Sequence, residues 1–186
     1  ATIKAGPGHV SHRLAYSHFL KESPTPYYSA LEKIRVLRSL GLEPAEDYKL
    51  HLNADAISEE FADLALRRMR IPKAPLIGIV PASRRITRRW PEDSYSLLGR
   101  KLHEDFGANI LIFWGPGEYE MATRIRQSIG AGAFVAPETA SLRQLAALLS
   151  RCQIVITNCN GPKHIAVAKG VPTLTIHGSS DPPLWN

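Results

Sequence analysis

The spacing of apolar residues shows little periodicity over 1–26 and helical periodicity in parts of 27–69. Apolar residues recur at helical spacing over 27–40, which predicts a helix that ends at a glycine. A second helix is expected over 58–69, with Ser58 as its N-cap and arginines in its last turn. Alternation over 48–52 favours a short strand, and the glycines and prolines of 1–26 favour a loop.

From Pro75 onward, short apolar runs alternate with segments of helical spacing. The expected strands span 76–80, 109–114, 133–136, 153–158 and 173–177. The expected helices span 94–106, 118–129 and 141–150, and a fourth begins at Pro162. Strict alternation implies a parallel sheet with right-handed crossovers, which is the doubly wound, Rossmann-like α/β class. We therefore expect a domain boundary between 74 and 75.

Composition narrows the class of protein but does not select a ligand. With 186 residues and 44% hydrophobic content, the chain can bury a full core. No apolar run approaches the roughly 20 residues that span a bilayer, and no signal-peptide pattern opens the chain. We therefore expect a soluble, cytoplasmic protein. The net charge of +6 fits nucleic acid, an acidic membrane surface or phosphorylated small molecules.

The residues with candidate chemistry lie in loops that follow the predicted strands, and in an open parallel sheet such loops meet at the ligand-binding edge. They span 81–89, 115–118, 158–164 and 178–181. In the third loop, Gly161 gives a ligand close access to the backbone, and the helix start presents unpaired N–H groups. Lys163 and His164 add cationic or hydrogen-bonding groups. This stretch is typical of an anion-binding site.

Four arginines crowd the first of these loops, at positions 84, 85, 88 and 89. Guanidinium groups form paired hydrogen bonds with phosphate oxygens, so the loop suits a diphosphate. On these residues alone, a solvated basic loop or a nucleic-acid contact stays equally open. The gathering of four loops at one sheet edge favours a small anionic ligand over an extended polyanion, so we expect no nucleic-acid partner.

The loop after the second predicted strand can meet a nucleotide, with Glu118 accepting hydrogen bonds from a ribose or a base. An ordinary connection between strand and helix is the alternative, and the chain has neither the G-x-G-x-x-G nor the P-loop pattern. Cys159 lies beside a helix start, but no base-and-orienter pattern accompanies it, so we interpret it as inert. No cysteine or histidine spacing indicates zinc, and we expect no metal.

Five short motifs follow one another after Pro75. They are Pro81-Ala82-Ser83, Arg88-Arg89-Trp90-Pro91-Glu92, Trp114-Gly115-Pro116-Gly117-Glu118, Asn158-Cys159-Asn160-Gly161-Pro162-Lys163-His164 and His177-Gly178-Ser179-Ser180-Asp181-Pro182. In order and spacing they resemble the heptosyltransferase-type glycosyltransferases of lipopolysaccharide core synthesis. The segment 27–66 also resembles the closing part of that family's first domain.

The resemblance implies a two-domain GT-B architecture. Residues 1–74 would close an acceptor-binding domain and form the linker, and 75–186 would bind a nucleotide sugar, typically ADP-heptose. It further implies inverting transfer to a lipopolysaccharide core acceptor, without a metal or other cofactor, and with a peripheral contact at the inner face of the inner membrane. The positions that match donor-binding motifs are Ser83, Arg88, Glu118, Asn160, Gly161, Pro162, His164, Ser179 and Ser180.

The resemblance also assigns roles within that set. Arg88 stands where the family has a phosphate-binding lysine, and Glu118 lies in the turn that meets the nucleoside. The turn around Gly161 would hold the phosphates. Ser179 and Ser180 lie in a small hydroxyl-bearing loop that closes the pocket.

Three departures from the family pattern bear on activity. The family motif reads Asn-Asp-Thr/Ser-Gly-Pro. In this chain Cys159 stands in place of the aspartate and Asn160 in place of the hydroxyl residue, so the turn lacks the acid that the family has there. The family's catalytic aspartate lies near the start of the first domain, which we expect this chain to lack, so no catalytic base is assigned. We also expect the final family segment to be missing after Asn186. The alternative function is therefore a nucleotide-sugar-binding homologue without turnover.

Overall fold

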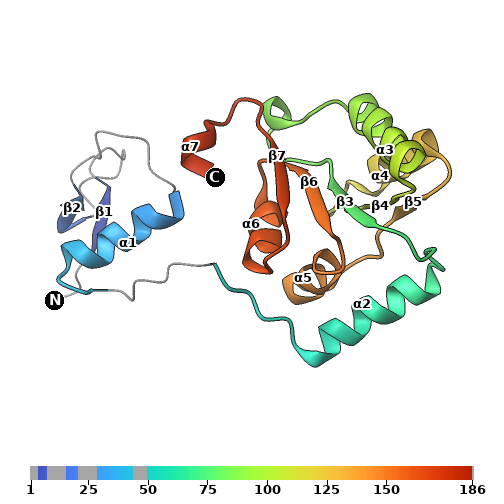
Figure 1. Ribbon diagram of the computed structural model, residues 1–186. Coiled ribbons are helices and arrows are strands. Elements are labelled where there is room, and N and C mark those ends of the chain that lie inside the picture. Colours follow the sequence, from blue (N-terminus) through green and yellow to red (C-terminus); the bar gives the residue numbers. More distant parts are fainter. Residues whose placement is uncertain (1–3, 8–15, 21–28, 44–49, 186) are drawn as a thin grey trace. The chain divides into compact units, whose positions relative to one another are not determined.

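The computed structural model describes residues 4–7, 16–20, 29–43 and 50–185 (Figure 1). The chain divides into two compact units, and each is described by itself. One unit comprises Ala1–Lys49 together with Ser180–Asn186, and the other comprises Leu50–Ser179. No helix within the described ranges combines the length and the apolar character that crossing a bilayer requires.

Short elements make up the described part of the first unit. They are β1 (Ala5–Pro7), β2 (His18–Leu20), α1 (Ser29–Ser39) and α7 (Pro182–Trp185). The prediction of loop over 1–26 is wrong at β1 and β2, which pair in parallel, because three-residue strands are too short to show alternation. The helix predicted over 27–40 is confirmed as α1, except that 27 and 28 lie outside the described residues. Gly41 follows it with a φ of +76°, the left-handed conformation common at helix ends.

Helix α2 (Ala56–Arg68) begins the second unit, and its N-cap corrects a prediction. Asp55, not Ser58, caps the helix, because the Oδ1 atom of Asp55 accepts the N–H of Ser58 at 2.9 Å. Both residue types favour this position, so composition alone does not separate them. Of the strand predicted over 48–52, positions 50–52 form no strand, and the rest lies outside the described residues.

A five-stranded parallel sheet forms the centre of the second unit (Figure 1). Its strands are β3 (Leu76–Val80), β4 (Asn109–Ile112), β5 (Ala133–Val135), β6 (Ile154–Asn158) and β7 (Thr173–Ile176). Their spatial order is β5-β4-β3-β6-β7, so the chain winds outward from β3 in one direction and then returns to wind in the other. The doubly wound, Rossmann-like prediction is confirmed. The direction reverses between β3 and β6, the place where open α/β sheets bind ligands.

Four helices connect these strands. They are α3 (Glu92–Phe106), α4 (Tyr119–Ile129), α5 (Leu142–Leu149) and α6 (Gly161–Ala168). Each matches a predicted helix within two residues at its start. Helix α5 has the expected cap, in which Ser141 Oγ accepts the N–H of Gln144 at 3.2 Å. The loop after β3 contains a short 3₁₀ helix, η2 (Ile86–Arg88), that was not predicted.

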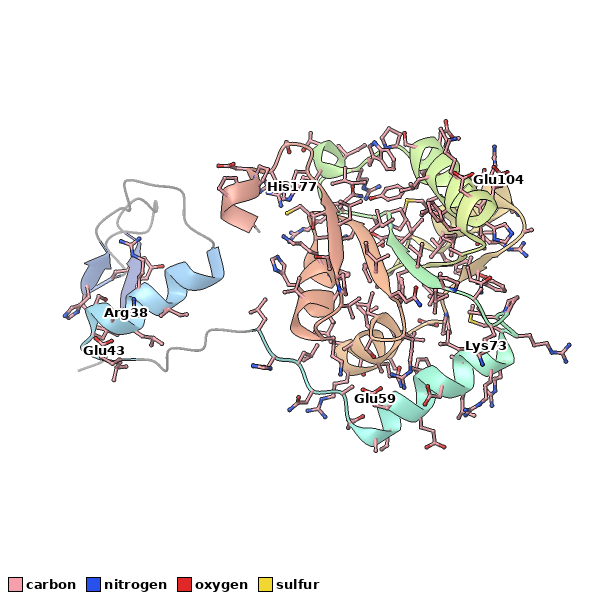
Figure 2. All side chains as sticks on the ribbon, in the orientation of Figure 1. Arg38, Glu43, Glu59, Lys73, Glu104 and His177 are labelled. Atoms are coloured by element: carbon pink, nitrogen blue, oxygen red, sulfur yellow. The ribbon has the colours of Figure 1, made fainter. Side chains whose placement is uncertain are left out.

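Two apolar cores lie on opposite faces of the sheet. On one face, Val80, Leu111 and Val155 pack with residues of α2, α5 and α6. On the other face, Ile79 and Ile110 pack with residues of α3 and α4. Both faces are covered, which is why the central strands are almost entirely apolar. The helices thus form a layer on each side of the sheet. In Figure 2, Lys73, which precedes β3, marks the amino edge of the sheet, and His177, which follows β7, marks its carboxyl edge.

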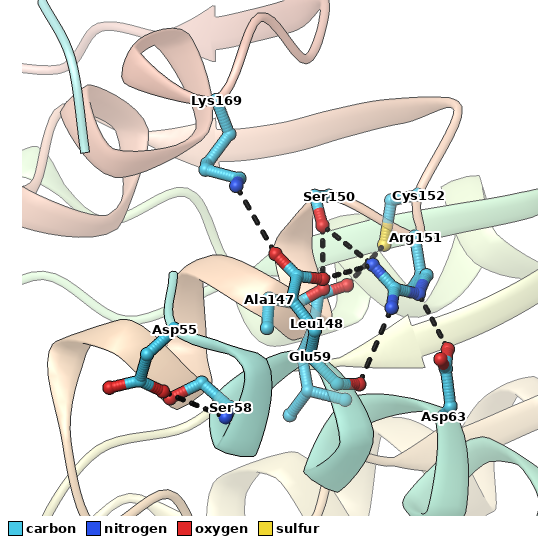
Figure 3. Close-up of polar contacts among 10 residues, drawn as sticks. All are labelled: Asp55, Ser58, Glu59, Asp63, Ala147, Leu148, Ser150, Arg151, Cys152 and Lys169. Atoms are coloured by element: carbon cyan, nitrogen blue, oxygen red, sulfur yellow. Dashed lines mark hydrogen bonds and ion pairs between the residues drawn. The ribbon is translucent and has the colours of Figure 1, made fainter. Parts of the chain in front are cut away.

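One arginine attaches helix α2 to the end of α5 (Figure 3). Arg151 donates from Nη1 to Glu59 Oε2 at 2.7 Å and from Nε to Asp63 Oδ1 at 2.8 Å. Lys169 Nζ, after α6, lies 3.4 Å from the other carboxylate oxygen of Glu59. Ala62, between the two acids, is fully buried in the adjoining core. Helix α2 therefore packs as part of the sheet unit, and the boundary between 74 and 75 stays a proposal for the domains of a longer protein.

We expect acid to weaken the attachment of α2. Hydrogen bonding by Arg151 lowers the pKa of Glu59 from its usual 4.5 and the pKa of Asp63 from its usual 3.8. Because both pKa values are lower in the folded protein, the stabilisation is complete above the unfolded values and is lost as the pH falls through and below them. The free energy of unfolding, measured with urea, should therefore decrease from about pH 5 downward.

Replacement of the arginine tests this assignment. The Arg151→Met protein should lose less stability than the wild type over the same drop in pH, because it has already lost the ion pairs. Arg100→Met is the matched control, since Arg100 donates to the carbonyl oxygen of Ser128 at 2.6 Å. It should keep the wild-type acid dependence. Equal acid dependence in the wild type and Arg151→Met would contradict the prediction.

Candidate functional site

The carboxyl edge of the parallel sheet brings the predicted site loops together. Strands β3 and β6 are direct neighbours, with Val80 paired to Thr157, so the loops that follow them start side by side. The loop after β3, residues 81–90, is called the arginine loop below. The loop after β4 lies one strand further on one side, and the loop after β7 one strand further on the other.

Asn158, the last residue of β6, holds both ends of the arginine loop. Its side chain is fully buried. The Nδ2 group donates to the carbonyl oxygen of Pro81, where the loop begins, and Oδ1 accepts the N–H of Trp90 at 3.0 Å, where the loop ends. One side-chain amide thus forms hydrogen bonds with two backbone groups that are 9 positions apart in the sequence. Sequence reasoning did not include Asn158 among the site residues.

Asn160 connects the same two loops and also caps α6. Its Nδ2 group donates to the carbonyl oxygen of Ala82 at 2.8 Å. Its Oδ1 atom accepts the N–H of Lys163 and the hydroxyl of Thr157, both at 3.1 Å. Gly161, the first residue of α6, is exposed, and a Cβ atom added there would meet no protein atom within 4 Å. The start of α6 therefore has open space in front of its backbone.

The cationic residues in the first turn of α6 are less accessible than the sequence suggests. The Lys163 side chain is only 4% exposed, and burial lowers its pKa. His164 is partly buried, and burial, with a smaller effect of the Lys163 charge, lowers the pKa of His164 from its usual 6.5. The imidazole is therefore mainly neutral near neutral pH and can donate a hydrogen bond without a formal charge. Pro162 occupies the first helical turn, as predicted.

The arginine loop is also held at its centre, by the loop after β7. Thr87 accepts the N–H of Ser179 through its carbonyl oxygen at 3.1 Å, and the two hydroxyl groups lie 2.8 Å apart. A Cβ atom added to Gly178 would lie 2.4 Å from that carbonyl oxygen, so only glycine permits this approach. Within the loop, Arg89 Nε donates to the carbonyl oxygen of the buried Ser83 at 2.7 Å. Arg88 is half-buried, and the other three arginines are exposed.

An aromatic hollow lies beside the loop that follows β4. Its volume is about 470 Å³, and it is lined by Trp114, Tyr119, Val135, Ala136, Pro137 and Glu138. The rings of Trp114 and Tyr119 meet edge to face, with centroids 4.9 Å apart, and Trp114 Nε1 donates to the carbonyl oxygen of Ala136 at 2.7 Å. Glu118, next to the hollow in sequence, accepts the N–H of Gly115 at 2.8 Å.

The structure brings most of the predicted positions to one edge. Ser83, Arg88, Glu118, Asn160, Gly161, Pro162, His164 and Ser179 lie in the sheet unit, in the loops or the first helical turn after its strands. Ser180 falls in the other unit, so its place relative to these residues is not described. Ligand contacts by any of them stay a prediction. Among the described residues, no three His, Cys, Asp or Glu side chains gather in a way that could hold a metal ion.

Two features of this edge were not predicted from the sequence, the paired hydrogen bonds of Asn158 and the aromatic hollow. Asn158 belongs to a quoted motif, but only the pairing of β3 with β6 shows that it reaches two loop ends. The hollow depends on Trp114, two positions after β4, and on 135–138 at and after the end of β5, which are brought together by strand pairing. The sequence signal that could have indicated the hollow was Trp114, a large aromatic residue just beyond a short apolar run.

Curated relatives and solved structures give a consistent family assignment. Lipopolysaccharide heptosyltransferase 2 of Salmonella typhimurium is 28% identical over 114 residues, which is 58% of this chain and 32% of that protein. Lipopolysaccharide heptosyltransferase 1 of Escherichia coli is 33% identical over 105 residues, which is 55% of this chain and 32% of that protein. The chain thus spans about a third of the length of these relatives.

Solved structures share the fold along the whole described chain. The glycosyltransferase family 9 protein of Veillonella parvula superposes with a TM-score of 0.85 at 25% identity, over 100% of this chain and 54% of that one. Escherichia coli heptosyltransferase WaaC, solved with ADP, gives a TM-score of 0.68 at 23% identity, over 97% and 56%. The predicted GT-B type of α/β fold is confirmed. Residues 10–186 match the sequence model of glycosyltransferase family 9 (heptosyltransferase), and the chain belongs to this family.

Proposed function

We propose that the protein to which this chain belongs transfers a heptose or a related sugar from an ADP-linked donor to a lipopolysaccharide core acceptor, with inversion and without a metal. The observation that carries the proposal is the meeting of the arginine loop with the open start of α6, at the reversal between β3 and β6. Family membership supports the reaction class. A donor diphosphate is the ligand that this combination of groups suits best.

The proposed donor site uses three neighbouring features. The diphosphate would lie in front of Gly161, where an added Cβ atom would meet no protein atom within 4 Å, and Arg88 would neutralise its charge. The neutral His164 would donate a hydrogen bond. The nucleoside would occupy the aromatic hollow, where Tyr119 supplies a ring and the neighbouring Glu118 accepts hydrogen bonds from ribose hydroxyls.

The proposed reaction is a single displacement. The acceptor hydroxyl oxygen bonds to the anomeric carbon while the bond from that carbon to the diphosphate oxygen breaks, and ADP leaves. The hydroxyl proton passes to a carboxylate, which we do not assign to a residue of this chain. Because one displacement reverses the configuration at carbon, the product is inverted. The cationic and N–H groups of the site stabilise the charge on the departing diphosphate.

Calorimetric titration tests donor binding. The full-length protein should bind ADP and inorganic diphosphate, and we expect ADP to bind more tightly than UDP because the hollow suits a large base. Absence of binding for all three would remove the proposal.

We place the protein in the cytoplasm, in peripheral contact with the inner membrane, and cell fractionation tests that location.

A second candidate function is nucleotide-sugar binding without turnover. It is favoured by Cys159 and Asn160, which replace the family's acid and hydroxyl residues. Cys159 is buried, and Asn160 is engaged with Ala82 and the N–H of Lys163. Transfer or donor hydrolysis by the full-length protein would exclude this alternative. The same assay tests metal independence, because turnover should persist in EDTA.

Gly161→Val should weaken ADP binding about tenfold or more while leaving the melting temperature nearly unchanged. A Cβ atom at Gly161 meets no protein atom within 4 Å, so we expect the fold to accept a side chain there, but this side chain would enter the space proposed for the phosphates. Cys159→Ala is the matched control in the same turn, and its buried thiol faces no such space. It should keep ADP affinity. Equal losses of affinity in both variants would count against this turn as the phosphate site.

A further inference from the structure

Asn160 makes a set of hydrogen bonds that few residue types could make. Its side chain supplies an N–H donor for the carbonyl oxygen of Ala82 and an acceptor for the N–H of Lys163. The Thr157 hydroxyl lies 3.1 Å from the same acceptor, but it also reaches the carbonyl oxygen of Asn158 at 2.9 Å. A carboxylate has no donor. A serine or threonine hydroxyl can cap the helix, but it is too short to cap the helix and also reach the carbonyl group across the neighbouring loop. An asparagine supplies both functions from one planar group.

The bond to Ala82 completes a series of attachments along the arginine loop. Asn158 holds the loop at Pro81 and at Trp90. Ser179 holds it at Thr87, directly before the half-buried Arg88. Asn160 adds the attachment nearest to the start of α6. The arginine loop is thus hydrogen-bonded to the end of β6 and the turn after it, and to the loop after β7. These segments belong to the two strands that lie beside β3 on one side of the sheet.

We propose that Asn160 is a positioning residue that joins the turn after β6 to the arginine loop and thereby holds that loop ready for the donor diphosphate. The inference rests on the proposed function and deepens it. Asn160 acts here through Ala82, not by touching the phosphates. The amide, which stands where the family has a hydroxyl residue, therefore contributes to donor affinity by keeping the loop ordered before the ligand arrives.

Two substitutions separate this role from simple helix capping. Asn160→Ser keeps a capping group and loses the bond to Ala82. Asn160→Asp keeps the shape and the capping oxygen, replaces the N–H donor by an acceptor oxygen and adds a negative charge. In the full-length protein without ligand, amide hydrogen exchange over 84–90 should accelerate in both variants. The dissociation constant for ADP should rise about fivefold to tenfold in Asn160→Ser, and further in Asn160→Asp because of its charge.

Ser141→Ala is the matched control. Ser141 caps α5 by accepting the N–H of Gln144, and none of the hydrogen bonds that hold the arginine loop in the described residues comes from Ser141. It should lower the melting temperature and leave both ADP affinity and exchange over 84–90 unchanged. Unchanged exchange in Asn160→Ser and Asn160→Asp would overturn the inference, as would wild-type ADP affinity in both. If the wild type binds neither ADP nor diphosphate, the proposed function fails, and the exchange measurement still decides whether Asn160 orders the loop.

Discussion

Arg88→Ala should weaken ADP binding by about 1.5 to 3 kcal/mol, a rise of about 10-fold to 150-fold in the dissociation constant. A charge-assisted bond from a guanidinium to a phosphate has this size in general. Arg88 is half-buried in η2, and its backbone adjoins Gly178, so its position is well defined. Isothermal titration of the full-length protein with ADP and with inorganic diphosphate measures the loss.

Arg84→Ala is the control, because Arg84 lies in the same loop, has the same charge and is exposed. It should change the affinity only slightly, and more at low salt than at high salt. If the two variants lose equal affinity, the loop attracts anions through its overall charge, and Arg88 has no special place at the diphosphate. Unchanged affinity in Arg88→Ala would show that the phosphates bind elsewhere.

Asn158→Ala should lower the free energy of unfolding by about 2 to 4 kcal/mol, because it removes the partner of one buried and one partly buried backbone group. These are the carbonyl oxygen of Pro81 and the N–H of Trp90. Each unsatisfied group costs about 1 to 3 kcal/mol. Urea unfolding gives the change in stability, and ADP titration of the folded protein should show weaker binding, because both ends of the arginine loop are released.

Asn109→Ala provides the comparison at the opposite edge of the sheet. Asn109 is also buried, at 2% exposure, but its side chain makes one bond, from Nδ2 to the carbonyl oxygen of Pro72 at 2.8 Å. Its replacement should cost about half as much stability and leave ADP affinity unchanged. A loss of ADP affinity in Asn109→Ala as large as in Asn158→Ala would mean that the effect reflects general destabilisation.

The sheet could be predicted because its strands carry their own signal. A strand such as β3 is a short run of apolar residues between turn residues, and burial on both faces removes the need for polar alternation. Helix ends were predicted well where a glycine follows, as at Gly107, which has a φ of +62°. The start of α2 was misplaced because Asp55 and Ser58 are both good capping residues.

The contacts that build the site could not be predicted in the same way. The bonds from Asn158 to Pro81 and from Asn160 to Ala82 join positions that are 77 and 78 apart in sequence. They exist because β6 lies next to β3, and an alternating pattern of strands and helices does not specify that order. Sequence motifs therefore gave the candidate site residues, whereas strand order explains how most of them come to lie at one edge.

The attachment of α2 has a practical consequence for dissecting this protein. Phe61 and Leu66 pack with Ala62 against the core beneath α5, and Arg151 binds acids of the same helix. A fragment that begins at Pro75 would lack α2. The apolar residues that pack against this helix would be exposed to solvent, and Arg151 would lose both of its carboxylate partners. A truncated form of the protein should therefore begin upstream of Asp55, so that the sheet unit keeps α2 together with its N-cap.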